Sequence, residues 1–219
     1  MPMARGCAAS GVAGPLPIVL LAAGAGRRMR GGDKLLELVD GVALLRRQAQ
    51  VAQASGAPVL VCLPDLSGPR AAALHDLPDL QLVTVTDAAD GMAASLAAGV
   101  RALPKNARAA LIWLADMPDI ETSDLIHMMA RFDSHSGGQS PAPIVQACSQ
   151  DGAPGHPVIF PADLFGALMT LRGDTGARSV LAAHRHRILP CPLDGNRALV
   201  DLDTPEAWAA WRAERMGGA

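Results

Sequence analysis

Short apolar runs alternate with helical patterns over the first 120 residues, and this alternation limits what the chain can fold into. The apolar runs occupy residues 16–23, 58–63, 80–85 and 109–115, and the helical patterns occupy residues 42–55, 68–75 and 92–103. Apolar strands separated by helices indicate βαβ units, in which helices cover both faces of a parallel sheet. We therefore expect an α/β fold with three layers and a mostly parallel central sheet.

The pattern changes after about residue 120. Helices are predicted at residues 123–132, 164–171 and 175–184, short strands at residues 143–147, 157–160, 187–191 and 198–200, and a polar loop at residues 133–141. Asp174 is the predicted N-cap of the third of these helices, and Thr204 with Pro205 predicts the start of a final helix. We expect the short strands to form a small insertion of mixed direction in the C-terminal half of the fold.

One domain accounts for most of the chain. The 219 residues suit a domain of moderate size, and no stretch is long enough to link two independent domains. Residues 1–15 are small, rich in Gly and Pro and without periodicity, so we expect a flexible N-terminal extension. The domain itself is predicted to span residues 16–214, followed by a tail at residues 215–219.

Charge and composition exclude several classes of protein. The formal net charge of −2 argues against a nucleic-acid coat and against a membrane-surface protein. Three Phe, three Trp and no Tyr provide almost no stacking platform for single-stranded nucleic acid. The four cysteines are far apart and lack metal-ligand spacing, which is typical of reduced thiols in a cytoplasmic protein. The apolar runs are too short to cross a bilayer, so we expect no membrane partner. Together with the charge and the scarcity of aromatic residues, this predicts a cytoplasmic protein that does not bind nucleic acid.

The loop after the first predicted strand, LAAGAGRRMRGGDK at residues 21–34, is rich in glycine and in basic residues. Its glycines allow backbone N–H groups to approach a ligand closely. Three arginines and Lys34 stand against one acid, Asp33, so the local charge is 4 − 1 = +3. Such a loop at the carboxyl end of a parallel strand suits a polyphosphate. The alternative is an exposed basic loop in which the glycines serve only flexibility.

Two standard phosphate-binding motifs fail in this loop. A dinucleotide-binding fingerprint requires Gly or Ala at the position of Met29, and a Walker A loop requires Lys at the position of Gly32. A second candidate group is Asp116, which follows the fourth apolar run and precedes Pro118. A carboxylate at this end of a parallel strand lies where substrates bind and offers Mg²⁺ a hard oxygen ligand. The alternative role of Asp116 is to cap the following helix.

The loop sequence L-A-A-G-x-G-x-R-M, followed by Lys34, resembles the signature of the nucleotidyltransferases that attach a nucleotide to molybdopterin. It resembles sugar-phosphate nucleotidylyltransferases more loosely. Arg30 departs from the family pattern, which usually has Gly directly after R-M. The resemblance implies a three-layer, Rossmann-like nucleotidyltransferase fold. Arg28 and Lys34 would be catalytic residues that offset charge on the leaving pyrophosphate. The implied nucleotide-binding residues of the loop are Leu21, Ala22, Ala23, Gly24, Ala25, Gly26 and Arg27.

Two further segments carry the resemblance into the nucleotide and metal sites. The D-x-x-x-G-M-x-x-S-L-x-x-G segment at residues 87–99 implies that the nucleotide is also bound by Asp87, Gly91 and Ser95. The D-M-P triplet implies that Asp116 is a catalytic residue and a metal ligand. The simpler alternatives are an Ala-rich core helix for residues 87–99 and a turn position for Asp87.

Three later segments carry the resemblance through the second half of the chain. G-H-P at residues 155–157 and G-D-x-G-A-R at residues 173–178 imply an acceptor site made of Gly155, His156, Asp174 and Arg178. D-x-D-T-P-E at residues 201–206 implies that Asp203 completes the metal site. The alternatives are a structural histidine in a turn, a helix N-cap at Asp174, and turn or cap roles for Asp201 and Asp203.

Taken together, the resemblance implies Mg²⁺-dependent transfer of CMP from CTP to molybdopterin or the molybdenum cofactor, with pyrophosphate as the second product. Residues 16–120 would bind the nucleotide and residues 121–214 the acceptor. Ala23 points to CTP, because guanylyltransferases of this family tend to have Gly there and a methyl group facing the base would exclude a purine. The implied transient partner is a molybdenum hydroxylase or its maturation factor.

Other functions remain as alternatives. A guanylyltransferase or a sugar-phosphate nucleotidylyltransferase would use the same loop. A non-catalytic carrier of the cofactor is disfavoured by the retained Lys34, Asp116 and Asp203. An NAD-dependent oxidoreductase is disfavoured by Met29 and by the basic residues of the loop.

Overall fold

The computed structural model describes residues 14–24, 26–88, 91–137, 140–173 and 176–217. Its strands are β1 (Ile18–Leu21), β2 (Leu38–Val39), β3 (Val42–Ala43), β4 (Val59–Leu63), β5 (Leu80–Thr84), β6 (Ala109–Leu114), β7 (Ile144–Cys148), β8 (Pro154–Pro161) and β9 (Ile188–Pro192). Its α-helices are α1 (Leu44–Ala54), α2 (Pro69–Ala73), α3 (Met92–Arg101), α4 (Thr122–Ser136), α5 (Phe165–Met169), α6 (Arg178–Ala183) and α7 (Pro205–Gly217). Its 3-10 helices are η1 (Arg27–Met29), η3 (Ala162–Leu164) and η4 (Arg185–Arg187).

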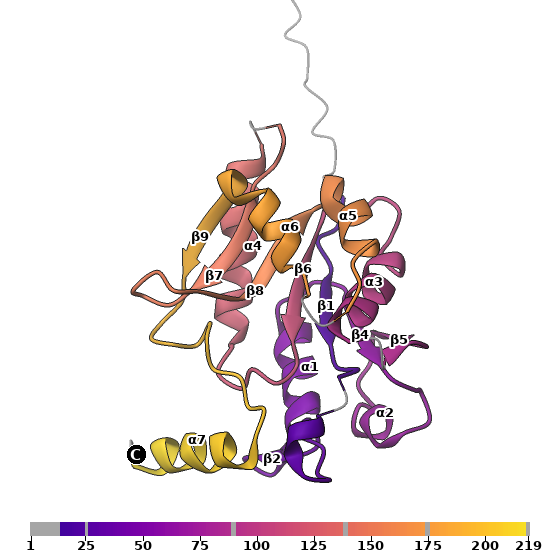
Figure 1. The fold of residues 1–219 in the computed structure, drawn as a ribbon, viewed down its shortest axis with the longest axis vertical. Coiled ribbons are helices and arrows are strands. Elements are labelled where there is room, and N and C mark those ends of the chain that lie inside the picture. The colour runs from indigo at the N-terminus through magenta and orange to yellow at the C-terminus, as the bar shows by residue number, and fades with distance from the viewer. Residues whose placement is uncertain (1–13, 25, 89–90, 138–139, 174–175, 218–219) are drawn as a thin grey trace, which may run out of the picture.

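The described strands form a seven-stranded sheet in the order β5-β4-β1-β6-β8-β7-β9 (Figure 1). β1 pairs in parallel with β4 and β6, β4 pairs in parallel with β5, and β7 pairs in parallel with β9. Within the described part of this sheet, β8 alone runs antiparallel to its neighbours β6 and β7. The predicted α/β fold is therefore confirmed, with a mostly parallel sheet and one antiparallel segment in the second half.

Successive residues of β1 face two different hydrophobic clusters. Ile18 and Leu20 belong to a first cluster that includes buried side chains of α1, α4 and α7. Val19 and Leu21 belong to a second cluster that includes side chains of α3, α5 and α6. Because neighbouring residues of a strand point to opposite faces, the sheet lies between two helical layers. The fold thus has three layers, as predicted (Figure 1).

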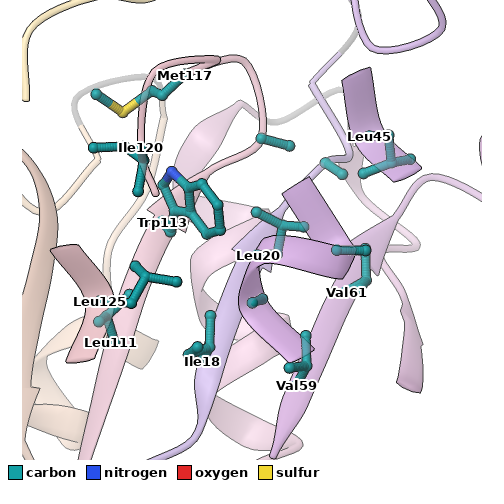
Figure 2. Close-up of a cluster of buried hydrophobic side chains, with 14 of the residues drawn as sticks. Ile18, Leu20, Leu45, Val59, Val61, Leu111, Trp113, Met117, Ile120 and Leu125 are labelled. Carbon is teal, nitrogen blue, oxygen red and sulfur yellow. The ribbon is translucent and has the colours of Figure 1, made fainter. Parts of the chain in front are cut away.

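Trp113 on β6 is a large, fully buried member of the first cluster. Figure 2 shows its indole with Leu20 and Ile120 beside it, on the face of the sheet covered by α1 and α4. β6 ends at Leu114, directly after this anchored residue, and Asp116 lies in the turn that follows, so the packing of the core helps to determine where that carboxylate lies.

Several predicted boundaries were wrong. Residues 198–200 form no strand, because residues 198–199 lie in a turn and residue 200 has no regular secondary structure. The first residues of the predicted loop at residues 133–141 form the last turn of α4, where the hydroxyls of Ser134 and Ser136 donate to carbonyls of the same helix. α6 begins at Arg178 rather than at Thr175, which lies with Asp174 outside the described residues.

A short hairpin, β2 with β3, was not predicted. Residues 42–43, expected in a helix, form its second strand. Its turn places Asp40 at φ 52° and Gly41 at φ 81°. An Asp-Gly pair suits two consecutive left-handed residues, which explains a hairpin at this point.

The final helix, α7, begins as predicted, with the Thr204 side chain accepting a hydrogen bond from the backbone N–H of Ala207 (3.1 Å). It includes residues 215–217, which were expected in the tail. Arg212 donates to Glu37 (2.8 Å), so α7 is attached to the segment that enters the β2–β3 hairpin (Figure 1). Residues 1–13, most of the predicted N-terminal extension, lie outside the described residues.

In the described part of the chain, every helix is too short or too polar to cross a bilayer. The described cysteines, Cys62, Cys148 and Cys191, are buried and free. Burial raises the pKa of the Cys62 thiol to about 12, so this thiol remains protonated.

Candidate functional site

The loop after β1 contains left-handed backbone on both sides of η1. Gly26 has φ 56° before η1, and Arg30 (φ 51°) and Gly31 (φ 99°) follow it. Backbone hydrogen bonds from Met29 to Gly26 (2.9 Å) and from Gly32 to Met29 (3.0 Å) close the two turns. Glycine adopts this conformation freely, whereas a residue such as Arg30 adopts it at a cost of about 1–2 kcal/mol.

Two basic residues of the loop are paired with carboxylates from distant parts of the chain. Arg28 donates to Asp203 (2.9 Å), in the segment that precedes α7. Lys34 donates to both Asp116, after β6, and Asp203. The predicted positive charge of the loop therefore lies opposite the two predicted metal ligands.

Lys34 is the central cation of this cluster, and its side chain is only 11% exposed. Burial acts to lower the pKa of Lys34. The charges of Asp116 and Asp203 and their hydrogen bonds outweigh burial, so the pKa lies above its ordinary value. Lys34 therefore stays cationic at neutral pH and balances two carboxylates.

Asp116 lies at the carboxyl end of β6, as predicted, and does not cap α4, whose capping residues are Glu121 and Asp124. One carboxylate oxygen of Asp116 accepts from Lys34, whereas the buried Oδ1 has no hydrogen-bond partner among the described residues. A buried carboxylate oxygen without a partner is unfavourable unless a donor or cation reaches it. The oxygens of Asp116 and Asp203 therefore fit a hard divalent cation.

Asp201 brings a third carboxylate near this cluster. Burial raises the pKa of Asp201, and the negative charges of Asp116 and Asp203 raise it further, while Lys34 acts in the opposite direction. Among the described residues, however, no group of three or more His, Cys, Asp or Glu side chains is arranged as a metal-binding cluster. The candidate metal site thus consists of two carboxylates, with Lys34 between them.

A first cavity of about 410 Å³ opens beside the loop. Its volume is in the range of small-molecule sites. Charged groups lie on one part of its wall, and small or apolar residues from the loop and from the start of α3 form the rest. Its lining residues are Leu21, Ala22, Gly24, Gly26, Arg28, Lys34, Leu35, Ala88, Gly91, Met92, Ser95, Leu114 and Asp116.

A second cavity of about 550 Å³ adjoins the first. The residues common to both walls are Leu21, Arg28, Met92 and Leu114. The second cavity adds mainly apolar side chains and a few polar groups from β8, α6 and the segment before α7. Its other lining residues are Leu96, Ile112, Met117, Pro154, Gly155, His156, Val158, Phe160, Gly176, Ala177, Arg178, Leu181, Ala198, Leu199, Asp201 and Asp203.

Gly155 and His156 meet the turn at Ala198. The backbone N–H of His156 donates to the carbonyl of Ala198 (3.0 Å), and a Cβ on Gly155 would lie 2.0 Å from that same oxygen. Glycine is therefore required at position 155 for this close approach. His156 lines the second cavity, and its buried Nδ1 has no hydrogen-bond partner among the described residues.

We expect acid to destabilise the protein through His156. Burial lowers the pKa of His156, Asp116 opposes this effect, and Arg178 reinforces it. The unfolded chain therefore takes up a proton near pH 6.5 while the folded protein does not, so stability falls as the pH drops below about 6.5. The unfolding midpoint, measured from pH 7.5 to 5.5, should fall more in the wild type than in His156→Gln. Parallel decreases would contradict this assignment.

The structure brings most of the predicted site residues together in the two cavities. The predicted residues that line the first cavity are Leu21, Ala22, Gly24, Gly26, Arg28, Lys34, Gly91, Ser95 and Asp116. Those that line the second are Leu21, Arg28, Gly155, His156, Arg178 and Asp203.

Two other predicted residues that the structure describes, Asp87 and Ala23, do not line these cavities. Asp87 lines a separate cavity of about 250 Å³ beside α3. Ala23 is buried in the second hydrophobic cluster, so its methyl group does not face the first cavity as expected. Ala25 and Asp174 lie outside the described residues, and so does the side chain of Arg27.

Sequence reasoning missed some contributors to the site. Arg30 donates to Glu206 on α7 (2.7 Å), a contact between residues too far apart in sequence to show a pattern. Arg70 on α2 is almost buried and reaches the loop through Asp33. The available signal was an arginine within the Ala-rich run of residues 69–73, because a buried arginine needs an acidic partner.

A family model described as the MobA-like NTP transferase domain matches residues 18–188. The chain belongs to this family. It is a nucleotidyltransferase, and the resemblance seen in the loop sequence is confirmed at that level. No curated protein sequence matches the chain significantly.

Solved structures share the fold over nearly the whole chain. Rv0371c from Mycobacterium tuberculosis H37Rv is 26% identical, with a TM-score of 0.77 over 91% of this chain and 98% of that one. A complex of that protein with manganese is 23% identical over 90% and 97% of the two chains, with a TM-score of 0.72.

Two other solved structures show the same architecture at lower identity. A nucleotidyl transferase from Methanothermobacter thermautotrophicus is 21% identical over 94% of this chain and 99% of its own, with a TM-score of 0.73. Molybdopterin-guanine dinucleotide biosynthesis protein A from Archaeoglobus fulgidus is 15% identical over 93% and 99% of the two chains, with a TM-score of 0.63. At these identities the similarity concerns the fold alone.

Proposed function

We propose that this nucleotidyltransferase transfers CMP from CTP to molybdopterin or the molybdenum cofactor. The observation that carries the proposal is the meeting of two adjoining cavities at Arg28, beside the cluster of Lys34, Asp116 and Asp203. A nucleoside triphosphate in the first cavity and a phosphorylated acceptor in the second would place their reacting groups at this junction. Residues 16–120 would supply most of the nucleotide site, and residues 121–214 most of the acceptor site.

The reaction requires positioning and charge neutralisation rather than a strong base. A phosphate monoester has a second pKa of about 6, so it is largely dianionic at neutral pH. Its oxygen would attack the α-phosphorus of CTP, forming the new P–O bond while the bond to pyrophosphate breaks. Arg28 and Lys34 would offset the charge that accumulates on the pyrophosphate.

The family and the donor set together favour a divalent cation, and we propose Mg²⁺. Asp116, whose Oδ1 has no partner among the described residues, would hold it together with Asp203. When bound, the cation would supply additional positive charge for the phosphate oxygens. The ion pairs of Lys34 and Arg28 with these carboxylates would then break. The carboxylates would face the metal, and the two basic side chains would face the triphosphate.

The preference for CTP rests on the sequence resemblance. Ala23 stands where guanylyltransferases of the family tend to have Gly, and the segments at residues 155–157 and 173–178 resemble the cytidylyl branch. Since the Ala23 side chain is buried in the second cluster, an effect of this residue on base choice would act through the backbone of the loop. The transient partner proposed is a molybdenum hydroxylase or its maturation factor, and the proposed location is the cytoplasm.

The test is pyrophosphate release by the purified protein with Mg²⁺, molybdopterin and CTP, GTP, ATP or UTP. Release with CTP alone is the expected result. Release with GTP would retain the reaction and overturn the base assignment. The same assay is repeated with sugar phosphates as the acceptor. Pyrophosphate release with a sugar phosphate but not with molybdopterin would show that the molybdopterin assignment is wrong. Failure with every nucleotide and acceptor would overturn catalysis and leave a carrier role.

We expect the removal of the Lys34 charge to strengthen metal binding in the absence of nucleotide. In Lys34→Met the carboxylates of Asp116 and Asp203 lose their shared counter-charge. A unit charge at about 4 Å contributes ~1–4 kcal/mol, so a divalent cation should bind about tenfold tighter or more. Titration with Mn²⁺, monitored by calorimetry, measures this directly. Lys105→Met, an exposed site elsewhere, is the matched control. Equal affinities in both variants would show that these carboxylates do not hold the metal.

A further inference from the structure

Arg70 on α2 connects the two ends of the loop between β1 and Lys34 and does not line either cavity. Its Nε and Nη2 donate to the two carboxylate oxygens of Asp33 at 2.7 and 2.9 Å. Its Nη1 donates to the carbonyl of Ala22 at 2.6 Å. Ala22 directly follows β1, and Asp33 directly precedes Lys34. One guanidinium group therefore contacts the beginning and the end of the loop.

The contact continues from Asp33 to the turn that carries Lys34. Asp33 Oδ1 accepts a hydrogen bond from the backbone N–H of Leu35 (3.0 Å). This bond closes a turn around Lys34, the residue between Asp33 and Leu35. The Arg70 side chain is only 8% exposed, and each of its three guanidinium nitrogens donates to a partner. Lysine carries the same charge but cannot reproduce a planar fork with a third donor.

We propose that Arg70 is a positioning residue for Lys34, holding the loop so that the Lys34 ammonium lies where charge develops during nucleotidyl transfer. The inference rests on the proposed function for its catalytic consequence. We call the contacts of Arg70 with Asp33 and Ala22 the clamp. Without the clamp the loop would still carry its basic residues, but Lys34 would be placed less accurately. Because the loss is one of placement at the transition state, kcat should fall more than KM rises.

The chain contains a matched control for this arrangement. Arg187 also has an 8% exposed side chain and donates to both oxygens of Asp163 (2.7 and 3.0 Å) and to a backbone carbonyl, that of Ala142 (2.7 Å). It lies at η4, and neither it nor Asp163 lines either cavity. Arg70→Lys and Arg187→Lys therefore remove the same type of contact, near the loop and away from it.

Two measurements on the full-length protein test the proposal. In pyrophosphate release, Arg70→Lys should lower kcat about 30-fold or more with KM changed less than about threefold, whereas Arg187→Lys should stay within about twofold of the wild type. Combining Arg70→Lys with Asp33→Asn should add little to either single effect, because both remove one contact. In hydrogen exchange, Arg70→Lys should accelerate amide exchange of the peptide covering residues 22–36, whereas Arg187→Lys should leave it unchanged.

The outcomes separate this inference from the proposed function. If Arg70→Lys is as active as Arg187→Lys, or if loop exchange is unchanged, the positioning role is wrong. A wild-type protein that releases no pyrophosphate with any nucleotide would overturn the proposed function. Faster loop exchange in Arg70→Lys would then still support the clamp, whereas unchanged exchange would overturn both.

Discussion

Asp116→Asn should fold normally and lose about 10²- to 10³-fold in kcat for pyrophosphate release. The amide has the shape of the carboxylate but lacks the charge that faces Lys34 and the proposed metal. The side chain is 15% exposed, and Lys34 keeps Asp203 as its other partner, so the substitution leaves no isolated buried charge. The rate measured at saturating CTP and acceptor, together with the unfolding midpoint, checks both parts of the expectation.

Asp79→Asn is the control for this substitution. Asp79 is exposed, has φ 56°, and does not line any of the cavities described above. Asn tolerates the left-handed conformation well, so this variant should match the wild type in both rate and stability. An Asp116→Asn protein with wild-type turnover would remove Asp116 from the proposed chemistry.

The largest effect on stability is expected for Trp113→Ala. Trp113 is fully buried within the first hydrophobic cluster (Figure 2). Removing its indole takes away a large apolar surface and leaves a cavity that surrounding β-strands cannot close. The free energy of unfolding should fall by about 3–5 kcal/mol. Because Trp113 anchors the end of β6 and Asp116 lies in the turn that follows, nucleotide binding should weaken as well. Denaturant unfolding and a CTP titration measure the two effects.

Trp113→Phe separates the effect of lost volume from the effect of a lost hydrogen bond. The buried indole Nε1 of Trp113 has no partner among the described residues, so its removal breaks no bond there. We expect a smaller loss of about 1–2 kcal/mol, in line with the smaller cavity. If Trp113→Phe were as destabilising as Trp113→Ala, packing volume would not explain the role of this residue.

The sequence by itself determined the parallel half of the fold and the centre of the site. β1, β4, β5 and β6 lie within the four predicted apolar runs. β1, β4 and β6 are buried on both faces and are therefore recognisable as continuous apolar sequence, whereas β5 is a partly exposed edge strand. The position of Asp116 followed from its place after the last of these runs. The resemblance of the loop motif singled out Arg28 and Lys34 as candidates, and the structure places both in the wall of the first cavity.

Only the tertiary structure decided which groups meet. The pairing of Lys34 with Asp116 and Asp203, and of Arg70 with Asp33, joins segments far apart in the chain, and such contacts produce no local periodicity. The direction of β8 and the burial of Ala23 against the second cluster likewise depend on neighbouring elements. A local pattern predicts the conformation of a segment, whereas the partner of a charged side chain depends on how distant segments pack together.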